Sequence, residues 1–224
     1  MIFVLTYNYP HKKTQDLLFK LLLHEYEKIT VVSTPWVQRK NFVPLYPHRI
    51  GKANNIYPKE LCNKLGFDYI ELNSLDEFPN IGIDDYILIG GAGIIKKKLA
   101  DSKKIINSHP AYLPLVRGLD SMKWAIYNNK PLGVTSHIIS EEADQGWLIK
   151  RQLVPLFEWD TFHSVAMRQY DIEIDLLASS IIDLKDATLE SLAVDGVEVH
   201  RRMPHRIEKE MILQFPDYVK KNLK

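Results

Sequence analysis

The stretch that decides the fold is residues 86–110, which read YILIGGAGIIKKKLADSKKIINSHP. An apolar run at residues 86–90 and a second one at residues 105–106 are separated by a glycine-rich turn. Short, continuous apolar runs bounded by turn residues are typical of buried parallel strands. The second run continues into Asn107 and His109, so the sequence predicts a strand that carries polar groups at its end.

Asn107 and His109 are expected to lie on the same side of this strand, because residues at positions i and i+2 of a strand point the same way. Pro110 follows directly and restricts the backbone where the strand ends. Open α/β sheets bind their ligands at the carboxyl ends of the strands. We therefore expect both side chains to face one pocket at this edge of the sheet.

Strands and helices are predicted to alternate along the whole chain. We expect strands at residues 2–6, 29–33, 69–72, 86–90, 132–139 and 148–154, and helices at residues 15–26 with Thr14 as N-cap, at 58–65, from Asp160 or Thr161 onward, and within 204–223. This alternation predicts an α/β fold with a doubly wound, mostly parallel sheet. Residues 192–200 are predicted to form a small hairpin around Asp195 and Gly196.

The composition is that of an ordinary globular protein, since 46% of the 224 residues are apolar and 25% are charged. The net charge is +1 with scattered Lys and Arg, so we expect no nucleic acid partner. Cys62, the lone cysteine, is predicted to be a small core residue. The sequence shows no secretion signal, no membrane-spanning run and no Cys/His spacing suited to zinc, so we expect a cytoplasmic protein without a bound metal ion.

Several polar motifs occur in the order and spacing seen in the folate-dependent formyltransferases. They are Asn107-x-His109-Pro110, Leu113-Pro114, Arg117-Gly118, Gly133-Val134-Thr135 and Glu141-Glu142-Ala143-Asp144-Gln145-Gly146. The sequence resembles this family over residues 80–180, and more loosely over the first strand and helix. The family usually reads Ser-Leu-Leu-Pro after His-Pro, whereas this chain reads Ala-Tyr-Leu-Pro at residues 111–114. The resemblance implies a Rossmann-like formyltransferase fold and 10-formyltetrahydrofolate as cosubstrate.

The resemblance implies that Asn107, His109 and Asp144 are the catalytic residues. Formyl transfer needs donors for the charge that collects on the carbonyl oxygen, and Asn107 and His109 can supply them. Asp144 can hold His109 and take the proton of the attacking amine, directly or through a water. An acidic loop is most often simply solvated, so without the resemblance Asp144 would not stand out from Glu141 and Glu142. This chemistry requires neither a metal ion nor a covalent intermediate.

Two segments are expected to bind the folate. By resemblance, the main chain near Gly93, Ile94 and Ile95 lines the pterin pocket, and glycine lets a flat ring approach the backbone closely. The alternative is a plain strand-to-helix turn, which needs only one of the three glycines there. The second segment is the loop that precedes Asp144, with Ser140, Glu141, Glu142 and Ala143 as cofactor-binding residues.

Lys12, Lys13, Arg49 and Glu173 are candidates for binding the acceptor substrate. The turn at residues 7–13 lacks the glycines with which glycinamide ribonucleotide formyltransferase holds its phosphate, so Lys12 and Lys13 either meet a phosphate by charge or form a solvated basic loop. Arg49 belongs to the irregular segment 34–57, whose aromatic and basic residues either bind a nucleotide or pack on one another. Glu173 either anchors the substrate amine or is a carboxylate at the edge of its helix. His137 is predicted to be a structural histidine.

The sequence most resembles the small bacterial formyltransferases that act on nucleotide-linked amino sugars, including CMP-linked sugars of the pseudaminic acid type, for surface glycans or flagellin. It shows neither the extra C-terminal domain of the methionyl-tRNA enzymes nor the N-terminal domain of the formylfolate hydrolases. The alternatives are formylation of a carrier-bound aminoacyl group or of glycinamide ribonucleotide, and a non-catalytic folate-binding protein. We expect a catalytic domain over residues 1–200 and a helical extension over residues 201–224. Segments beyond residue 180 are candidates for a homodimer interface.

Overall fold

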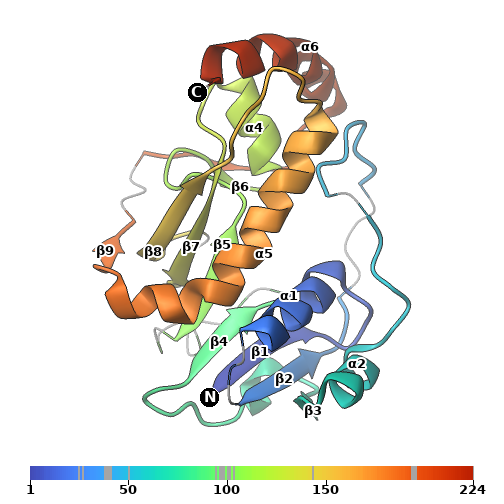
Figure 1. Ribbon diagram of the computed structural model, residues 1–224, viewed down its shortest axis with the longest axis vertical. Coiled ribbons are helices and arrows are strands. Elements are labelled where there is room, and N and C mark those ends of the chain that lie inside the picture. The colour runs from blue at the N-terminus through green and yellow to red at the C-terminus, as the bar shows by residue number, and fades with distance from the viewer. Residues whose placement is uncertain are drawn as a thin grey trace.

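A mixed β-sheet runs through the centre of the protein, as the computed structural model in Figure 1 shows. The structure describes residues 1–24, 26, 28–37, 42–49, 51–93, 95, 99, 102, 104–142, 144–192 and 196–223. Within these residues, eight strands form the main sheet in the order β3-β2-β1-β4-β5-β7-β8-β9. The strands from β3 to β5 are parallel, and β7, β8 and β9 join them antiparallel. The predicted α/β class with a mostly parallel sheet is confirmed.

The bounds of most elements agree with the sequence pattern to within a few residues. The strands are β1 (Ile2–Tyr7), β2 (Ile29–Thr34), β3 (Asp68–Glu71), β4 (Tyr86–Ile89), β5 (Ile105–His109), β6 (Arg117–Gly118), β7 (Gly133–Ile139), β8 (Gly146–Leu153), β9 (Glu190–Ser191) and β10 (Val199–His200). The helices are α1 (Lys12–Leu23), α2 (Pro58–Leu65), the 3₁₀ turn η1 (Leu75–Glu77), α4 (Ser121–Tyr127), α5 (Phe162–Asp186) and α6 (His205–Asn222). None of the helices in the described part of the chain is long and apolar enough to cross a membrane.

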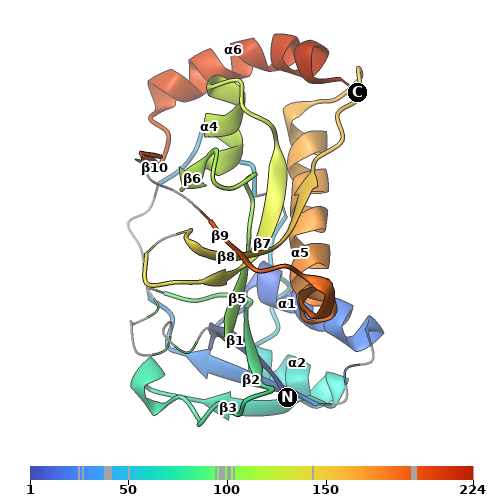
Figure 2. The ribbon, with the colours of Figure 1, turned by 90° about the vertical axis from the view of Figure 1, so that its left-hand side faces the viewer.

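Helices cover the sheet because the continuous apolar strands have two faces to bury. Leu17 of α1, Cys62 of α2 and Leu177 of α5 pack in one cluster against β1, β2 and β4. Cys62 is fully buried, as predicted. The opposite face of the same strands packs against η1 and the chain that follows it. Figure 2 shows α1 and α5 side by side along one face of the sheet.

The C-terminal helix α6 closes the end of the molecule that lies farthest from β3 (Figure 1). Its buried residues Met211, Phe215 and Tyr218 belong to the same hydrophobic cluster as residues of α4 and the first half of α5. The long helix α5 is capped by Thr161, one of the two predicted N-cap residues, and the Thr161 side chain accepts a hydrogen bond from the Ser164 backbone in a capping box. The helical extension therefore shares its core with the preceding part of the chain.

Helix α1 begins three residues earlier than the sequence pattern predicts. Thr14 does not cap the helix, because its hydroxyl is buried and hydrogen bonds the hydroxyl of Thr6 at 2.6 Å. The N-cap position falls on His11 instead. Lys12 and Lys13 therefore belong to the first helical turn and not to a loop, which changes the direction of both side chains.

The predicted hairpin at residues 192–200 is wrong. β9 pairs antiparallel with β8, whereas β10 pairs parallel with β6 in a separate two-stranded sheet. This second pairing requires Gly118, which has φ +89° and whose missing Cβ would lie 2.2 Å from the carbonyl oxygen of His200. The hairpin signal at Gly196 is local, whereas the partner of β10 lies about 80 residues away along the chain and leaves no local pattern.

Candidate active site

His109 and Asp144 meet at the carboxyl end of β5. His109 is the last residue of that strand, and Asp144 lies in the loop between β7 and β8 with a left-handed backbone, φ +56°. The His109 Nδ1 and Asp144 Oδ1 atoms are 3.2 Å apart, and both side chains are largely buried. The structure thus brings together two residues that are 35 positions apart and that the sequence predicts to act as a pair.

Two further groups join this pair. The Gly118 backbone N–H donates a 2.7 Å hydrogen bond to Asp144 Oδ2. Ser121, at the start of α4, has its Oγ 3.1 Å from His109 Nε2 and 2.7 Å from the carbonyl oxygen of Gly118. Ser121 is not among the residues that the sequence motifs indicated. The signal for it was the polar Asp120-Ser121 pair at the start of a helix that directly follows the Arg117-Gly118 motif.

Asn107 lies on the same side of β5 as His109, by the alternation of the strand. Across the sheet it pairs with His137 of β7, so His137 also faces this side. The His137 ring is fully buried, and its Nδ1 lies 3.2 Å from the backbone carbonyl oxygen of Gln145, next to Asp144. Burial and the neighbouring His109 lower the pKa of His137 to about 4, so the ring is neutral near pH 7 and donates to that carbonyl. This contact supports the predicted structural role, because it holds the loop that carries Asp144.

The charge state of His109 is set by opposing effects. Burial lowers its pKa, the carboxylates of Asp144 and Glu173 raise it, and the nearby cations Lys13 and Arg49 lower it. The net shift is downward, which favours a neutral imidazole at neutral pH. A neutral imidazole has one N–H, and the Asp144 carboxylate favours that proton on Nδ1, so donation from Nε2 requires the second ring proton.

A hollow of about 580 Å³ opens directly on this pair. Its walls come from β5, β6, β10 and the loop before β8, and its lining residues are His109, Gly118, Leu119, Asp144, Val199, His200 and Arg201. The volume lies in the range typical of small-molecule sites. A ligand in this hollow would contact both His109 and Asp144.

An ion cluster around a buried carboxylate lies next to the pair, with the Arg49 side chain partly exposed. The side chain of Glu173 on α5 is 1% exposed and contacts Arg49 on one oxygen and Lys13 on the other, the latter at 2.9 Å. Lys13 Nζ also lies 3.3 Å from the backbone oxygen of Ser108, the neighbour of His109. Burial alone would raise the pKa of Glu173, but Arg49 and Lys13 outweigh it and lower the pKa to about 2.

Two alternatives from the sequence, a solvated loop position for Lys13 and a boundary position for Glu173, are therefore wrong. Lys13 is not a solvated loop residue, because the early start of α1 turns it toward α5. Glu173 is not a boundary carboxylate, because α1 and the segment that carries Arg49 cover it completely. Both errors come from the tertiary contact between α1 and α5, which are separated by about 150 residues in the chain.

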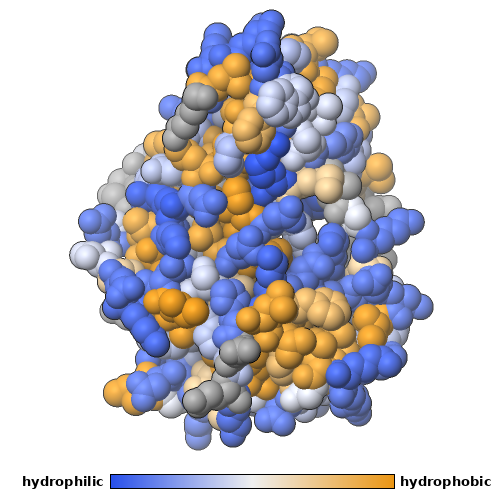
Figure 3. All heavy atoms as spheres, viewed as in Figure 1, coloured by the Kyte–Doolittle hydropathy of each residue, from blue (hydrophilic) through white to orange (hydrophobic). Residues whose placement is uncertain are grey.

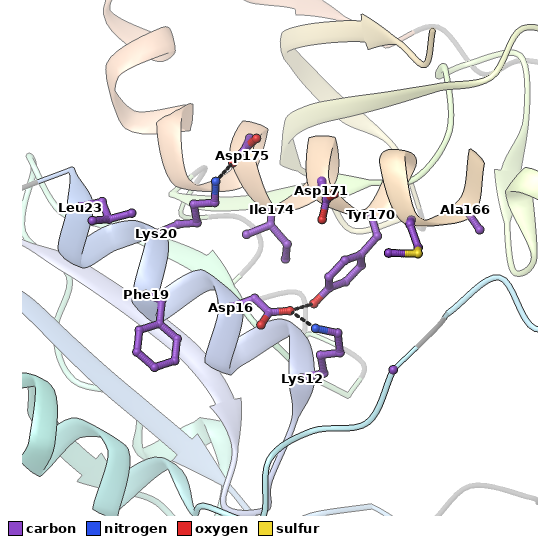
Figure 4. A pocket seen from close by; sticks show the side chains of 12 residues that line it. Lys12, Asp16, Phe19, Lys20, Leu23, Ala166, Tyr170, Asp171, Ile174 and Asp175 are labelled. Carbon is purple, nitrogen blue, oxygen red and sulfur yellow. Dashed lines mark hydrogen bonds and ion pairs between the residues drawn. The ribbon is translucent and has the colours of Figure 1, made fainter. Parts of the chain in front are cut away.

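Lys12 lies apart from this cluster, in a second hollow of about 700 Å³ between α1 and α5 (Figure 4). Its Nζ is 2.6 Å from Asp16 Oδ2, and the Tyr170 hydroxyl donates to the same carboxylate. Figure 3 shows a hydrophobic patch on this face of the molecule, and Phe19 and Leu23 of α1, which line the hollow, are exposed. Of the four substrate-binding candidates, Lys13, Arg49 and Glu173 converge and Lys12 does not.

The structure describes most of the predicted folate-binding residues. Gly93 is exposed, and a Cβ there would meet no atom within 4 Å. At Gly91, by contrast, a Cβ would lie 2.9 Å from the His11 side chain, so the close approach of His11 requires glycine at this position. Ile95 packs against the core behind β4. Ser140 donates its backbone N–H to the Gln145 carbonyl, and the other described members, Glu141 and Glu142, are exposed. Ile94 and Ala143 lie outside the described residues, and all these roles stay predictions.

The segment 34–57 packs on the rest of the protein in its described parts, 34–37, 42–49 and 51–57. Trp36 lies edge-on to Tyr7 at 4.8 Å between ring centroids, and Tyr46 contacts Phe162 of α5. The backbone N–H of Leu45 donates to Glu208 of α6. The aromatic side chains therefore contact other elements more than one another, and Arg49 is carried to Glu173 by a segment that is held at several points.

Gly146 is expected to be indispensable for the loop that carries Asp144. It has φ +128°, and a Cβ would lie 1.9 Å from the carbonyl oxygen of Ile138. Gly146→Ala should therefore cost about 3 kcal/mol or more in the free energy of unfolding, measured by urea denaturation. Gly66→Ala is the matched control, because φ is +74° but no atom lies within 4 Å, and it should cost only about 1 kcal/mol. Equal losses would contradict the steric argument.

Comparison with known proteins identifies the region that holds this site. Residues 77–181 match a family model described as formyl transferase. The chain contains a formyl transferase domain. The domain includes β5, the loop with Asp144, Ser121 and the part of α5 that carries Glu173.

Relatives of this formyl transferase domain are found among enzymes with different acceptors. The chain is 25% identical over 188 residues to methionyl-tRNA formyltransferase of Trichormus variabilis, covering 80% of this chain and 54% of that one. It is 31% identical over 100 residues to dTDP-4-amino-4,6-dideoxyglucose formyltransferase of Mycobacterium tuberculosis, covering 44% and 43%. The chain thus spans about half of the length of these curated relatives.

The fold is shared with solved structures. The N-formyltransferase from Helicobacter canadensis, in complex with folinic acid and dTDP-3-aminofucose, superposes with a TM-score of 0.63 at 18% identity, covering 96% of this chain and 80% of that one. This likeness confirms the formyltransferase fold that the motifs predict.

Proposed function

We propose that the protein is an N-formyltransferase that moves the formyl group of 10-formyltetrahydrofolate to the primary amine of a nucleotide-linked amino sugar. The observation that carries the proposal is the buried His109–Asp144 pair on the wall of an open hollow inside a formyl transferase domain. The hollow is large enough for the reacting part of a folate, and the exposed Gly93 leaves its main chain accessible to a flat ring.

The catalytic steps follow from the groups on the hollow. 10-Formyltetrahydrofolate supplies the formyl carbon and a nitrogen that can leave. Asn107 and His109 donate hydrogen bonds to the formyl oxygen while the amine attacks the carbon, and each such donor is worth a factor of about 10²–10³ in rate. Asp144 accepts the proton that the amine loses, directly or through a water, and returns it to the departing nitrogen. One C–N bond forms and one breaks, so the protein ends in its starting state.

The ion cluster supports a phosphate-bearing acceptor. Lys13, Arg49 and the ionised Glu173 together carry a charge of +1 beside Ser108 and His109. A net positive cluster favours the diphosphate of a nucleoside diphosphate sugar, while the carboxylate can orient an amine. The names of two relatives support the same class of acceptor, since one is a formyltransferase of a dTDP-linked amino sugar and the other was solved in complex with one.

A mass-spectrometric assay tests the proposal. The protein is incubated with 10-formyltetrahydrofolate and CMP-, UDP- and dTDP-linked amino sugars, CMP-linked nonulosonates, glycinamide ribonucleotide, and an aminoacylated carrier protein. We expect one class of nucleotide-linked amino sugar to gain a formyl group. The sugar assignment fails if another acceptor reacts in its place, and the enzyme assignment fails if folate binds and no acceptor reacts.

Glu173→Gln separates acceptor binding from folate binding in the same assay. The substitution keeps the shape and removes the charge that faces Lys13 and Arg49, so KM for the acceptor should rise about ten-fold while KM for the folate stays unchanged. Glu158→Gln is the matched control, because Glu158 is exposed on a turn and should leave both constants unchanged. An unchanged acceptor KM in Glu173→Gln would remove Glu173 from the acceptor site.

A further inference from the structure

Four groups close a ring of polar contacts that contains both nitrogens of His109. His109 Nδ1 faces Asp144 at 3.2 Å, and Asp144 accepts from the Gly118 N–H at 2.7 Å. The Gly118 carbonyl accepts from Ser121 Oγ at 2.7 Å, and the same Oγ lies 3.1 Å from His109 Nε2. Ser121 is 2% exposed, so no bulk water competes for its hydroxyl.

Counting protons shows when all four polar contacts around the His109 imidazole can form at once. Ser121 has one hydroxyl proton, and when this proton points to the Gly118 carbonyl, Oγ can only accept from an Nε2–H. An ionised Asp144 likewise needs an Nδ1–H, so all contacts are made at once only when the imidazole carries both protons. With one proton, on Nδ1, the Ser121 hydroxyl must turn from the Gly118 carbonyl and donate to Nε2.

We propose that Ser121 is a positioning residue whose hydroxyl follows the protonation state of His109 and holds Nε2 until a formyl oxygen takes its place. When the Nε2–H of the doubly protonated ring donates to a formyl oxygen, Ser121 loses one contact but keeps its hydrogen bond to the Gly118 carbonyl. The imidazole ring therefore needs no rotation in either protonation state. The inference rests on the proposed function, in which His109 donates to the formyl oxygen.

Ser121 acts beside several charged groups that also face His109. They are Asp144 from the loop before β8, Glu173 from α5, Lys13 from α1 and Arg49 from the segment before α2, and the titratable but neutral His137 of β7 is also close. The charged groups influence both nitrogens of the ring at once. Ser121 differs from them because it is uncharged and contacts Nε2 directly, so its removal should act on one nitrogen only.

The test is an NMR titration of the His109 imidazole in the folded protein, with Ser121→Ala and Ser121→Thr. Ser121→Ala removes an acceptor of the charged ring and should lower the pKa of His109 by about one unit. The matching limb of the pH dependence of kcat/KM should move by the same amount. Ser121→Thr retains the hydroxyl and should restore the wild-type titration. Ser180→Ala, which removes another buried serine hydroxyl far from His109, controls for general loss of packing.

Two results would overturn the inference. One is an unchanged His109 titration in Ser121→Ala, and the other is a Ser121→Thr variant that behaves like Ser121→Ala. The titration needs no substrate, so its outcome is independent of the proposed reaction. If the His109 titration shifts but the protein formylates no acceptor, the proposed function is wrong and the contact of Ser121 with His109 remains supported. If the protein formylates an acceptor but the titration does not shift, the proposed function stands and the positioning role of Ser121 is wrong.

Discussion

Replacing His109 with Ala is expected to lower kcat/KM for formyl transfer by about 10³-fold. The variant loses one donor to the formyl oxygen and leaves Asp144 without the ring that it faces at 3.2 Å. Initial rates by mass spectrometry, with saturating folate and the acceptor found in the panel, measure the effect. His163→Ala is the control, because His163 is an exposed histidine in the first turn of α5 and should keep wild-type activity.

Asp144→Asn should act on the same step, with a loss of about 10²-fold, because the amide cannot accept the proton of the amine. Residues that act as a unit are not additive, so the double variant should be hardly slower than His109→Ala. Losses that multiply in the double variant would show that the two residues act on separate steps. Full activity in His109→Ala would remove His109 from the mechanism.

The second large effect is expected in stability and concerns the buried charges that join α4 to α6. Lys123 and Glu208 are fully buried and form an ion pair, and Glu208 also accepts from the Leu45 N–H at 2.8 Å. Glu208→Ala leaves Lys123 in the core with Asp120 as its carboxylate neighbour among the described residues, at 3.8 Å, and Asp120 is also paired with Arg202. We expect a loss of about 3–5 kcal/mol in the free energy of unfolding, measured by urea denaturation.

Two further variants separate charge burial from simple contact loss. Lys123→Met combined with Glu208→Leu removes both buried charges at similar volume and should recover most of the lost stability. Arg206→Ala breaks an exposed pair on the same helix, Arg206 with Glu210 at 3.2 Å, and should cost about 1 kcal/mol or less. A double variant as unstable as Glu208→Ala would show that the ion pair itself stabilises the fold.

Local sequence was sufficient for most elements and for the core of the site. Continuous apolar runs marked β1, β2 and β4, and Thr161 marked the start of α5, because strand burial and helix capping depend on neighbouring residues. Asn107 and His109 were placed on one side of β5 by the two-residue period of a strand. Asp144 needed the family resemblance, because nothing local distinguishes it from the other acids of its loop.

Neighbouring residues alone indicated most strands and helices of the main sheet and placed Asn107 and His109 on one side of β5, and the spacing of the motifs pointed to the formyl transferase fold. Only the tertiary structure decided that Lys13 and Arg49 bury Glu173, that Ser121 contacts His109, and that β10 pairs with β6 and not with β9. These contacts join different elements of the fold. Their geometry depends on how helices rotate and strands align in the packed core, which no local pattern encodes.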